Sequence, residues 1–200
     1  MSLSSNALIT VKEYKEYISV DQSDSLVNNS QIERSIDGVS KRIENYCNRK
    51  FITPSSAIEE IFDGNGFESY YVNNARINDS STNVPILYNW NGTSWDVMDS
   101  STYPRTYDDE SGVIYLNNGQ KFNTIKRYYR IDYKYGWSIS DVPDNVKLAC
   151  VEMVKRAILR FKKEGFKSDS VADSRITYDF IEMPDFIKDS LNTFKVVQSG

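Results

Sequence analysis

Histidine is absent from this chain of 200 residues, and cysteine occurs only twice, at Cys47 and Cys150. Without histidine the sequence cannot form a serine or cysteine triad of the usual kind, a histidine-ligated zinc site, or the commonest general base. Both cysteines lie in helical patterns and neither belongs to a Cys-x-x-Cys pair, so we expect two small, buried thiols in a reduced compartment. These absences favour a protein that performs no chemistry.

The sequence also lacks long hydrophobic runs and an excess of basic residues. No run approaches the length of a transmembrane span, and Met1–Ser5 does not resemble a signal peptide, so we expect a soluble protein made in the cytoplasm. A formal net charge of −4 argues against a dedicated nucleic-acid-binding protein. The 14 tyrosines suit half-buried strands and wet interfaces.

Three stretches show the three-and-four spacing of amphipathic helices. The first begins at the capping box Thr10–Glu13, and the second follows a similar box at Ser30–Glu33. The third begins near Pro143 and ends near Gly165, and a shorter helix follows Pro184. Gly38 interrupts the second helix at a cost in helix propensity, which predicts close packing at that point.

Between residues 57 and 137 the pattern changes to short runs separated by turn residues, which is typical of β structure. We expect strands near residues 58–62, 67–72, 84–90, 113–116 and 125–135. Asn91-Gly92 and Asn118-Gly119 predict hairpins. Tyr129, Tyr133 and Tyr135 share one face of the last strand, which indicates the packed face of a sheet or, alternatively, a stacking platform for a sugar or nucleic acid.

These patterns predict an α+β fold, with a small helical bundle and an antiparallel β-hairpin or sheet insertion between the second and third long helices. We expect one domain: a helical core at 8–52 and 141–165, a β insertion at 57–137, and a C-terminal arm at 168–200. A polar stretch precedes a renewed apolar pattern near the C-terminus. We therefore expect residues 176–194 to project from the helical core.

Candidate catalytic groups are few. Glu59, Glu60, Asp108, Asp109 and Glu110 could in principle supply an acid/base pair of the glycosidase type, but no partner pattern fixes a geometry. We expect no catalytic residue, no cofactor and no metal site.

One basic run occurs near the end of the third helix, at Lys155, Arg156, Arg160, Lys162 and Lys163. It fits a solvated helix face whose cations suit the C-terminal end of the helix dipole. Contact with phosphates or with a neighbouring subunit is the alternative.

Four phrases resemble the head–tail connector proteins, also called adaptor or DNA-packaging proteins, of long-tailed bacteriophages and prophages. They are Leu8–Tyr17, Ile43–Phe51, Val142–Cys150, and a tail formed by Ile176–Tyr178 followed by Met183–Leu191. Each phrase alone is weak, but they occur in the family's order. The β segment between them is longer than in many relatives.

The resemblance implies a non-enzymatic viral structural protein that forms a ring below the portal. Its partners would be the portal protein, a head-completion or tail-completion protein, and other copies of itself. DNA would pass through the ring without specific readout, and no membrane would be bound. It would be located in the virion, and in the host cytoplasm during assembly. The alternative function is a carbohydrate- or ligand-binding β module that uses the tyrosine-rich strand.

The C-terminal apolar set is the predicted partner-binding surface. Its members are Tyr178, Ile181, Met183, Phe186, Ile187, Leu191 and Phe194.

Overall fold

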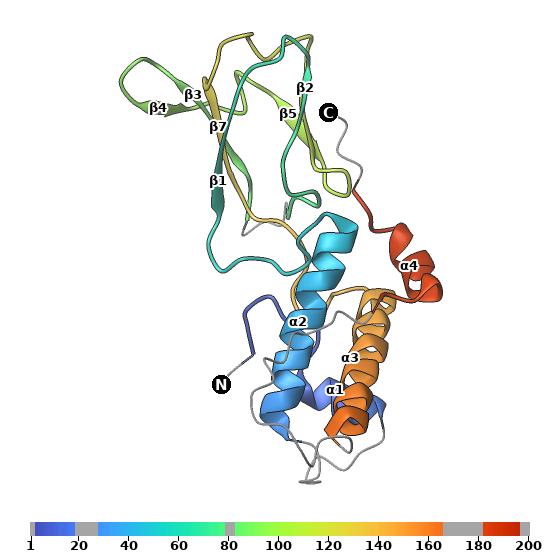
Figure 1. The fold of residues 1–200 in the computed structure, drawn as a ribbon. Coiled ribbons are helices and arrows are strands. Elements are labelled where there is room, and N and C mark those ends of the chain that lie inside the picture. The colour runs from blue at the N-terminus through green and yellow to red at the C-terminus, as the bar shows by residue number, and fades with distance from the viewer. Residues whose placement is uncertain (1–2, 19–27, 79–82, 166–181, 197–200) are drawn as a thin grey trace. The chain divides into compact units, whose positions relative to one another are not determined.

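The computed structural model describes residues 3–18, 28–78, 83–165 and 182–196, and the chain divides into two compact units (Figure 1). The helical unit comprises residues 1–49 and 141–200, and the β unit comprises residues 50–140. Within the described residues, four helices and two antiparallel sheets confirm the α+β class.

The first two helices begin at well-defined caps. Helix α1 (Val11–Tyr17) has the predicted capping box, because the Thr10 side chain accepts from the Glu13 amide and the Glu13 carboxylate accepts from the Thr10 amide. Helix α2 (Asn29–Cys47) begins one residue before the predicted box at Ser30. Its N-cap is Asn28, whose side-chain oxygen accepts from the Ser30 amide at 2.9 Å.

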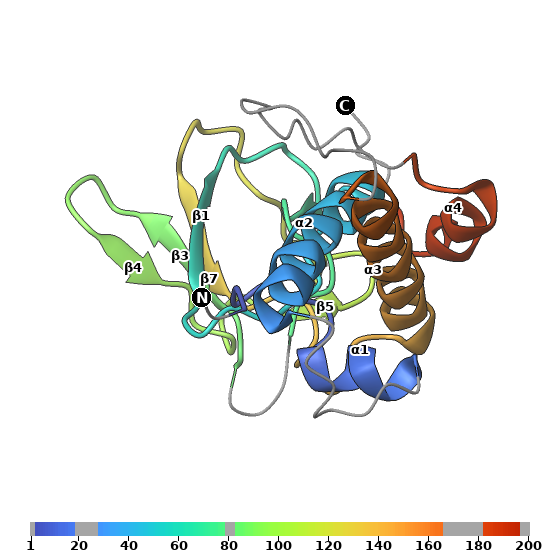
Figure 2. The ribbon, with the colours of Figure 1, turned by 60° about the horizontal axis from the view of Figure 1, so that its bottom comes forward.

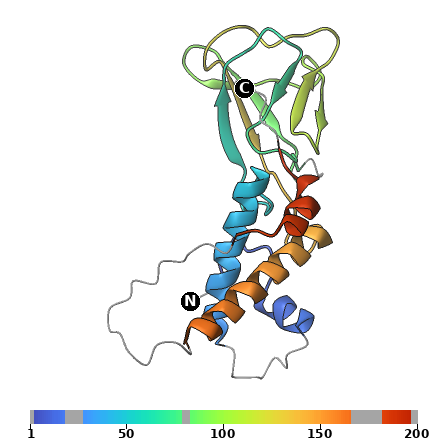
Figure 3. The same ribbon diagram turned by 45° about the vertical axis from the view of Figure 1, so that its right-hand side comes forward.

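The helical unit is built around the contact between α2 and α3 (Asp144–Gly165), which run in opposite directions (Figure 3). Helix α1 contacts α2, and α4 (Asp185–Asn192) lies alongside α3 (Figures 1 and 2) and also contacts α2. The buried apolar side chains of the long helices are Ile32, Ile36, Val39, Ile43 and Cys47 on α2, and Val146, Ala149, Cys150, Met153, Val154 and Ile158 on α3. Each larger aliphatic chain contributes about 1.5–3 kcal/mol by leaving water.

Gly38 differs from expectation. It lies on the exposed side of α2, and a Cβ added to it would meet nothing within 4 Å. The prediction of close packing at Gly38 is therefore wrong for the isolated chain. The residue still weakens the helix by about 1 kcal/mol relative to alanine.

The β unit contains two antiparallel sheets. The first has the order β1-β7-β3-β4, and the second has the order β2-β6-β5. The strands are β1 (Ile58–Phe62), β2 (Ser69–Tyr71), β3 (Ile86–Trp90), β4 (Trp95–Val97), β5 (Arg105–Asp108), β6 (Val113–Leu116) and β7 (Tyr129–Tyr133).

Turn chemistry predicted only part of this topology. Asn91-Gly92 does join the antiparallel strands β3 and β4. Asn118 and Gly119 do turn the chain, with φ of 59° and 73°, but β6 pairs with β2 and β5 rather than with β7. Strand β5 was not expected, because residues 105–108 lack a clear period-two pattern of apolar side chains.

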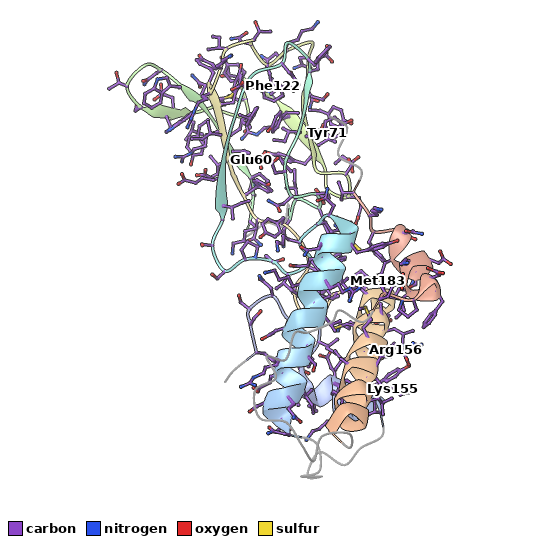
Figure 4. The ribbon with its side chains drawn as sticks, viewed as in Figure 1. Glu60, Tyr71, Phe122, Lys155, Arg156 and Met183 are labelled. Carbon is purple, nitrogen blue, oxygen red and sulfur yellow. The ribbon has the colours of Figure 1, made fainter. Side chains whose placement is uncertain are left out.

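Side chains from both sheets form one core in the β unit. Phe122 (Figure 4) is fully buried in this core, with its ring 5.6 Å from that of Phe62 and 5.0 Å from that of Tyr129. Tyr129 and Tyr133 are almost completely buried. The interpretation of the tyrosine-rich strand as the packed face of a sheet is therefore confirmed, and Tyr135 lies partly buried against the same core.

A buried carboxylate, Glu60, lies beside this core (Figure 4). The Tyr133 hydroxyl donates to its Oε2 at 2.7 Å, the Tyr70 hydroxyl donates to its Oε1 at 3.0 Å, and the Asn73 amide donates to both oxygens at 3.1 Å. The Tyr133 hydroxyl in turn accepts from the Asn74 amide. Burial and the adjacent Glu60 charge raise the pKa of both tyrosines, so the hydroxyls stay protonated and serve as donors.

Replacing Glu60 with alanine should destabilise the β unit by on the order of 3 kcal/mol, because it leaves a buried hydroxyl and a backbone amide without their acceptor. All three tryptophans, at positions 90, 95 and 137, belong to the β unit, so their fluorescence during urea unfolding reports on it directly. Glu59→Ala is the matched control on the exposed side of β1, with an expected loss below about 0.5 kcal/mol. Equal losses for the two variants would contradict the assigned role of Glu60.

Both thiols are buried and free, as expected from the sequence. Burial raises the pKa of Cys47 to about 11 and that of Cys150 to about 12. Ellman's reagent at pH 8 should therefore modify neither cysteine in the folded chain and both in urea, since only an accessible thiolate reacts. Two thiols that react quickly without denaturant would contradict this packing. Because both lie in α2 and α3, their exposure reports on the helical unit.

Candidate assembly surfaces

The predicted C-terminal binding residues divide into a buried and an exposed set. Met183, Ile187 and Leu191 are buried in the helical unit, where α4 contacts α3 and α2. The expectation that residues 176–194 project from the helical core is therefore wrong for residues 183–191. Tyr178 and Ile181 lie outside the described residues.

Among the described members of this set, Phe186 and Phe194 keep exposed surface. Phe186 is 55% exposed, and the Arg156 guanidinium carbon lies 5.5 Å from its ring centroid. Phe194 is half-buried. The segment after α4 is held to α2 by a hydrogen bond from the Val196 amide to the Cys47 carbonyl at 2.9 Å, and Tyr46 donates to the Asn192 side chain at 2.7 Å.

The solvent face of α3 combines apolar and charged side chains. Lys155 and Arg156 are both exposed on it (Figure 4), between Leu148 and Leu159, whose side chains are each about half exposed. Arg160, Lys162 and Lys163 belong to the same helix, but their side chains lie outside the described part of the structure. The two interpretations of this basic run therefore both remain predictions.

A second surface covers one side of the first sheet. Because side chains alternate across a strand and the register is known, the residues of this face follow directly. They are Glu59 and Ile61 of β1, Arg130 and Asp132 of β7, Ile86, Tyr88 and Trp90 of β3, and Trp95 and Val97 of β4. We call this set the outer sheet face. Its isoleucines and Val97 are 40–59% exposed.

Arg130 occupies the middle of the outer sheet face. Its guanidinium bonds Asp132 at 2.8 Å, lies 3.7 Å from the Glu59 carboxylate, and stacks over the Tyr88 ring at 4.2 Å. The Trp95 ring centroid is 5.7 Å from the same guanidinium carbon. Trp, Tyr and Arg are the residue types that contribute most at protein interfaces. The combination of a fixed arginine, aromatic rings and exposed aliphatic chains favours a binding role for this face.

Sequence reasoning did not find the outer sheet face. The polar alternation in residues 126–134 pointed to a solvent side of β7, but the pairing of β7 with both β1 and β3 cannot be read from that strand alone. Only this pairing places the rings of Tyr88 and Trp95 beside Arg130.

Four of the five carboxylates considered for acid/base chemistry are held in ion pairs or hydrogen bonds. Glu59 and Glu60 are adjacent in β1 and therefore point to opposite faces, one to Arg130 and one to the buried tyrosines. Asp108 accepts from the Ser111 amide in a turn, and Glu110 pairs with Arg76. Among the described residues, no group of three or more Cys, Asp or Glu side chains could hold a metal ion. No helix in the described ranges is long and apolar enough to cross a membrane.

Packed helices and a two-sheet core define an α+β protein, and the aromatic and aliphatic side chains of the outer sheet face give it a surface suited to binding other proteins. The chain belongs to the head completion protein family, whose sequence model matches residues 7–197. The search among curated proteins finds no match.

Solved structures of gene transfer agent (GTA) particles share the fold. A chain from the neck of an empty GTA particle, computed with C6 symmetry, is 11% identical with a TM-score of 0.63, over 100% of this chain and 95% of that chain. A chain from the virion of the native particle is 9% identical with a TM-score of 0.60, over 100% and 95%. A chain from the neck of the native particle, computed with C12 symmetry, is 12% identical with a TM-score of 0.58, over 100% and 94%. At these identities the likeness concerns the fold.

Leu191→Ala should destabilise the helical unit by about 2–5 kcal/mol, because it opens a cavity at a fully buried position. Phe186→Ala on the exposed side of the same helix should cost about 0.5 kcal/mol or less. Urea unfolding followed by circular dichroism at the helical band measures both. Similar losses would show that α4 does not pack as described.

Proposed function

We propose that this protein is a structural head–tail connector subunit of a tailed bacteriophage or prophage particle. Copies of the chain form a ring below the portal, DNA passes through the ring, and tail-completion proteins attach to it. The protein acts by binding and positioning other proteins and not by catalysis. Its location is the virion, after assembly in the host cytoplasm.

The observation that carries this proposal is membership of the head completion protein family over residues 7–197. The fold shared with chains of GTA particle necks, one of them computed with C12 symmetry, supports a ring as the form of assembly. A subunit of a closed ring needs two different surfaces, because each copy contacts one neighbour with one face and the other neighbour with another.

The surfaces of both units suit such a role. The outer sheet face offers aromatic rings around Arg130, and the helical unit offers exposed Leu148, Leu159 and Phe186. Phe186, which is 55% exposed and lies beside Arg156, is a member of the predicted C-terminal set that a partner can reach. Passage of DNA without specific readout is consistent with the net charge of −4, since tight non-specific binding needs a basic surface.

The alternative, a carbohydrate- or ligand-binding β module, loses the feature that suggested it. Tyr129 and Tyr133 are 3% and 1% exposed, so their rings cannot stack on a ligand. Buried rings on this strand favour a role in the core of the β unit.

Deleting the encoding gene from the phage or prophage tests the proposal. We expect DNA-filled heads and free tails that do not join, and restoration of tailed particles when the full chain is supplied from a plasmid. Electron microscopy of the lysate distinguishes the two cases. Tailed, infectious particles in normal number without the gene would overturn the proposal.

A further inference from the structure

The solvent face of α2 carries a basic stripe with a notch. Gln31, Arg34, Gly38, Lys41 and Asn45 are all exposed and follow one another at spacings of three and four, so they lie in one line along the helix. Gly38 has open space where a side chain would be, and Arg34 and Lys41 lie one turn to either side of it.

The solvent face of α3 carries the opposite pattern. Leu148 is 46% exposed, and the exposed Asp144 and the half-exposed Glu152 lie one turn to either side of it. Glu152 accepts one hydrogen bond from Tyr17 at 3.2 Å, which holds its side chain beside the stripe. The charge pattern of α3 is therefore acid, leucine, acid, whereas that of α2 is base, glycine, base.

The two stripes face away from each other within one chain. Helices α2 and α3 pack through their buried faces, so their solvent faces lie on opposite sides of the pair. The helices are antiparallel (Figure 3). When copies are placed side by side by rotation about an axis along the helices, α3 of one copy meets α2 of the next in antiparallel orientation.

In one antiparallel register, the leucine and both acidic residues of α3 lie opposite the glycine and the two basic residues of α2. With Leu148 opposite Gly38, Glu152 falls opposite Arg34, and Asp144 falls within one residue of the position opposite Lys41. The lengths of the stripes along the helix axes agree, since Arg34 and Lys41 are seven positions apart, or about 10 Å, and Asp144 and Glu152 are eight positions apart, or about 12 Å. A glycine that weakens an isolated helix then has a packing reason, because only glycine leaves room for the leucine of the neighbour.

We propose that a second copy of this chain docks on α2, with Leu148 of its α3 seated in the notch at Gly38 and its Asp144 and Glu152 paired with Lys41 and Arg34. This inference deepens the proposed function, on which it rests, because it assigns the contact between ring neighbours. The contact is heterologous, so each copy uses both stripes and the series can close into a ring.

Charge reversal tests the contact on the full-length chain. R34E/K41E makes α2 acidic, and D144K/E152K makes α3 basic, so each variant alone sets like charges against each other. Sedimentation velocity from ~1 μM to ~1 mM should show reversible self-association of the wild-type chain and at least about tenfold weaker association of each variant. The fourfold variant R34E/K41E/D144K/E152K, and an equimolar mixture of the two double variants, should associate again.

A matched control separates this contact from a general effect of charge. K121E/K126E changes the net charge by the same amount as R34E/K41E, at exposed positions of the β unit, and should leave association unchanged. G38L places a side chain in the notch, and should abolish association while the thermal melting temperature stays at or above that of the wild-type chain, because leucine is the better helix former. Circular dichroism confirms that each variant is folded.

Three outcomes would overturn the inference: a wild-type chain that stays monomeric throughout, double variants that associate as the wild type does, or a fourfold variant no better than the double ones. The proposed function is tested independently by the gene deletion. Plasmid-borne charge variants that restore tailed particles as well as the wild-type gene would reject the α2–α3 contact and leave the connector role intact.

Discussion

The β unit depends on the burial of one carboxylate, that of Glu60. A charge out of water is costly unless hydrogen bonds replace its hydration, and here two tyrosine hydroxyls and one backbone amide supply them. These donors come from β7 and from the segment around β2, so the carboxylate joins the two sheets at the point where β1 enters the core. The aromatic packing of Phe62 on Tyr70, both next to this site, requires that the hydroxyl of Tyr70 be satisfied.

The same strand alternation that buries Glu60 exposes Glu59, and the same alternation in β7 buries Tyr133 and exposes Arg130. Core and outer sheet face are thus two sides of one set of strands. A change of register by one residue would exchange them, so the core fixes which residues the protein offers to a partner. On this surface Arg130 is held by Asp132 and by the Tyr88 ring, and a side chain that is already held loses little entropy on binding.

Sequence reasoning predicted the helices better than the sheets. The stripe on α2 and the capping box at Thr10 are local signals, since each involves residues three or four apart. Strand pairing is not local: β1 pairs with β7, some seventy residues later in the chain, and no single strand encodes its partner. The outer sheet face and the hydrogen bonds around Glu60 both arise from such pairings, so neither could be predicted from the sequence. The apolar set around Leu191 was found, but periodicity cannot distinguish a stripe that binds a partner from one that packs on its own chain.

Gly38 illustrates how a feature without a purpose in one chain can be explained by assembly. A mid-helix glycine costs about 1 kcal/mol relative to alanine, and nothing within the described chain packs against it. Replacing Gly38 with alanine would recover this stability, because the added methyl group would meet open space. In a ring held together by the proposed contact, Gly38 would act at every subunit boundary, so a small loss of stability in each chain would be offset by close approach at each boundary. The residues least favourable to the folding of a single chain are therefore useful guides to the surfaces on which a ring subunit meets its neighbour.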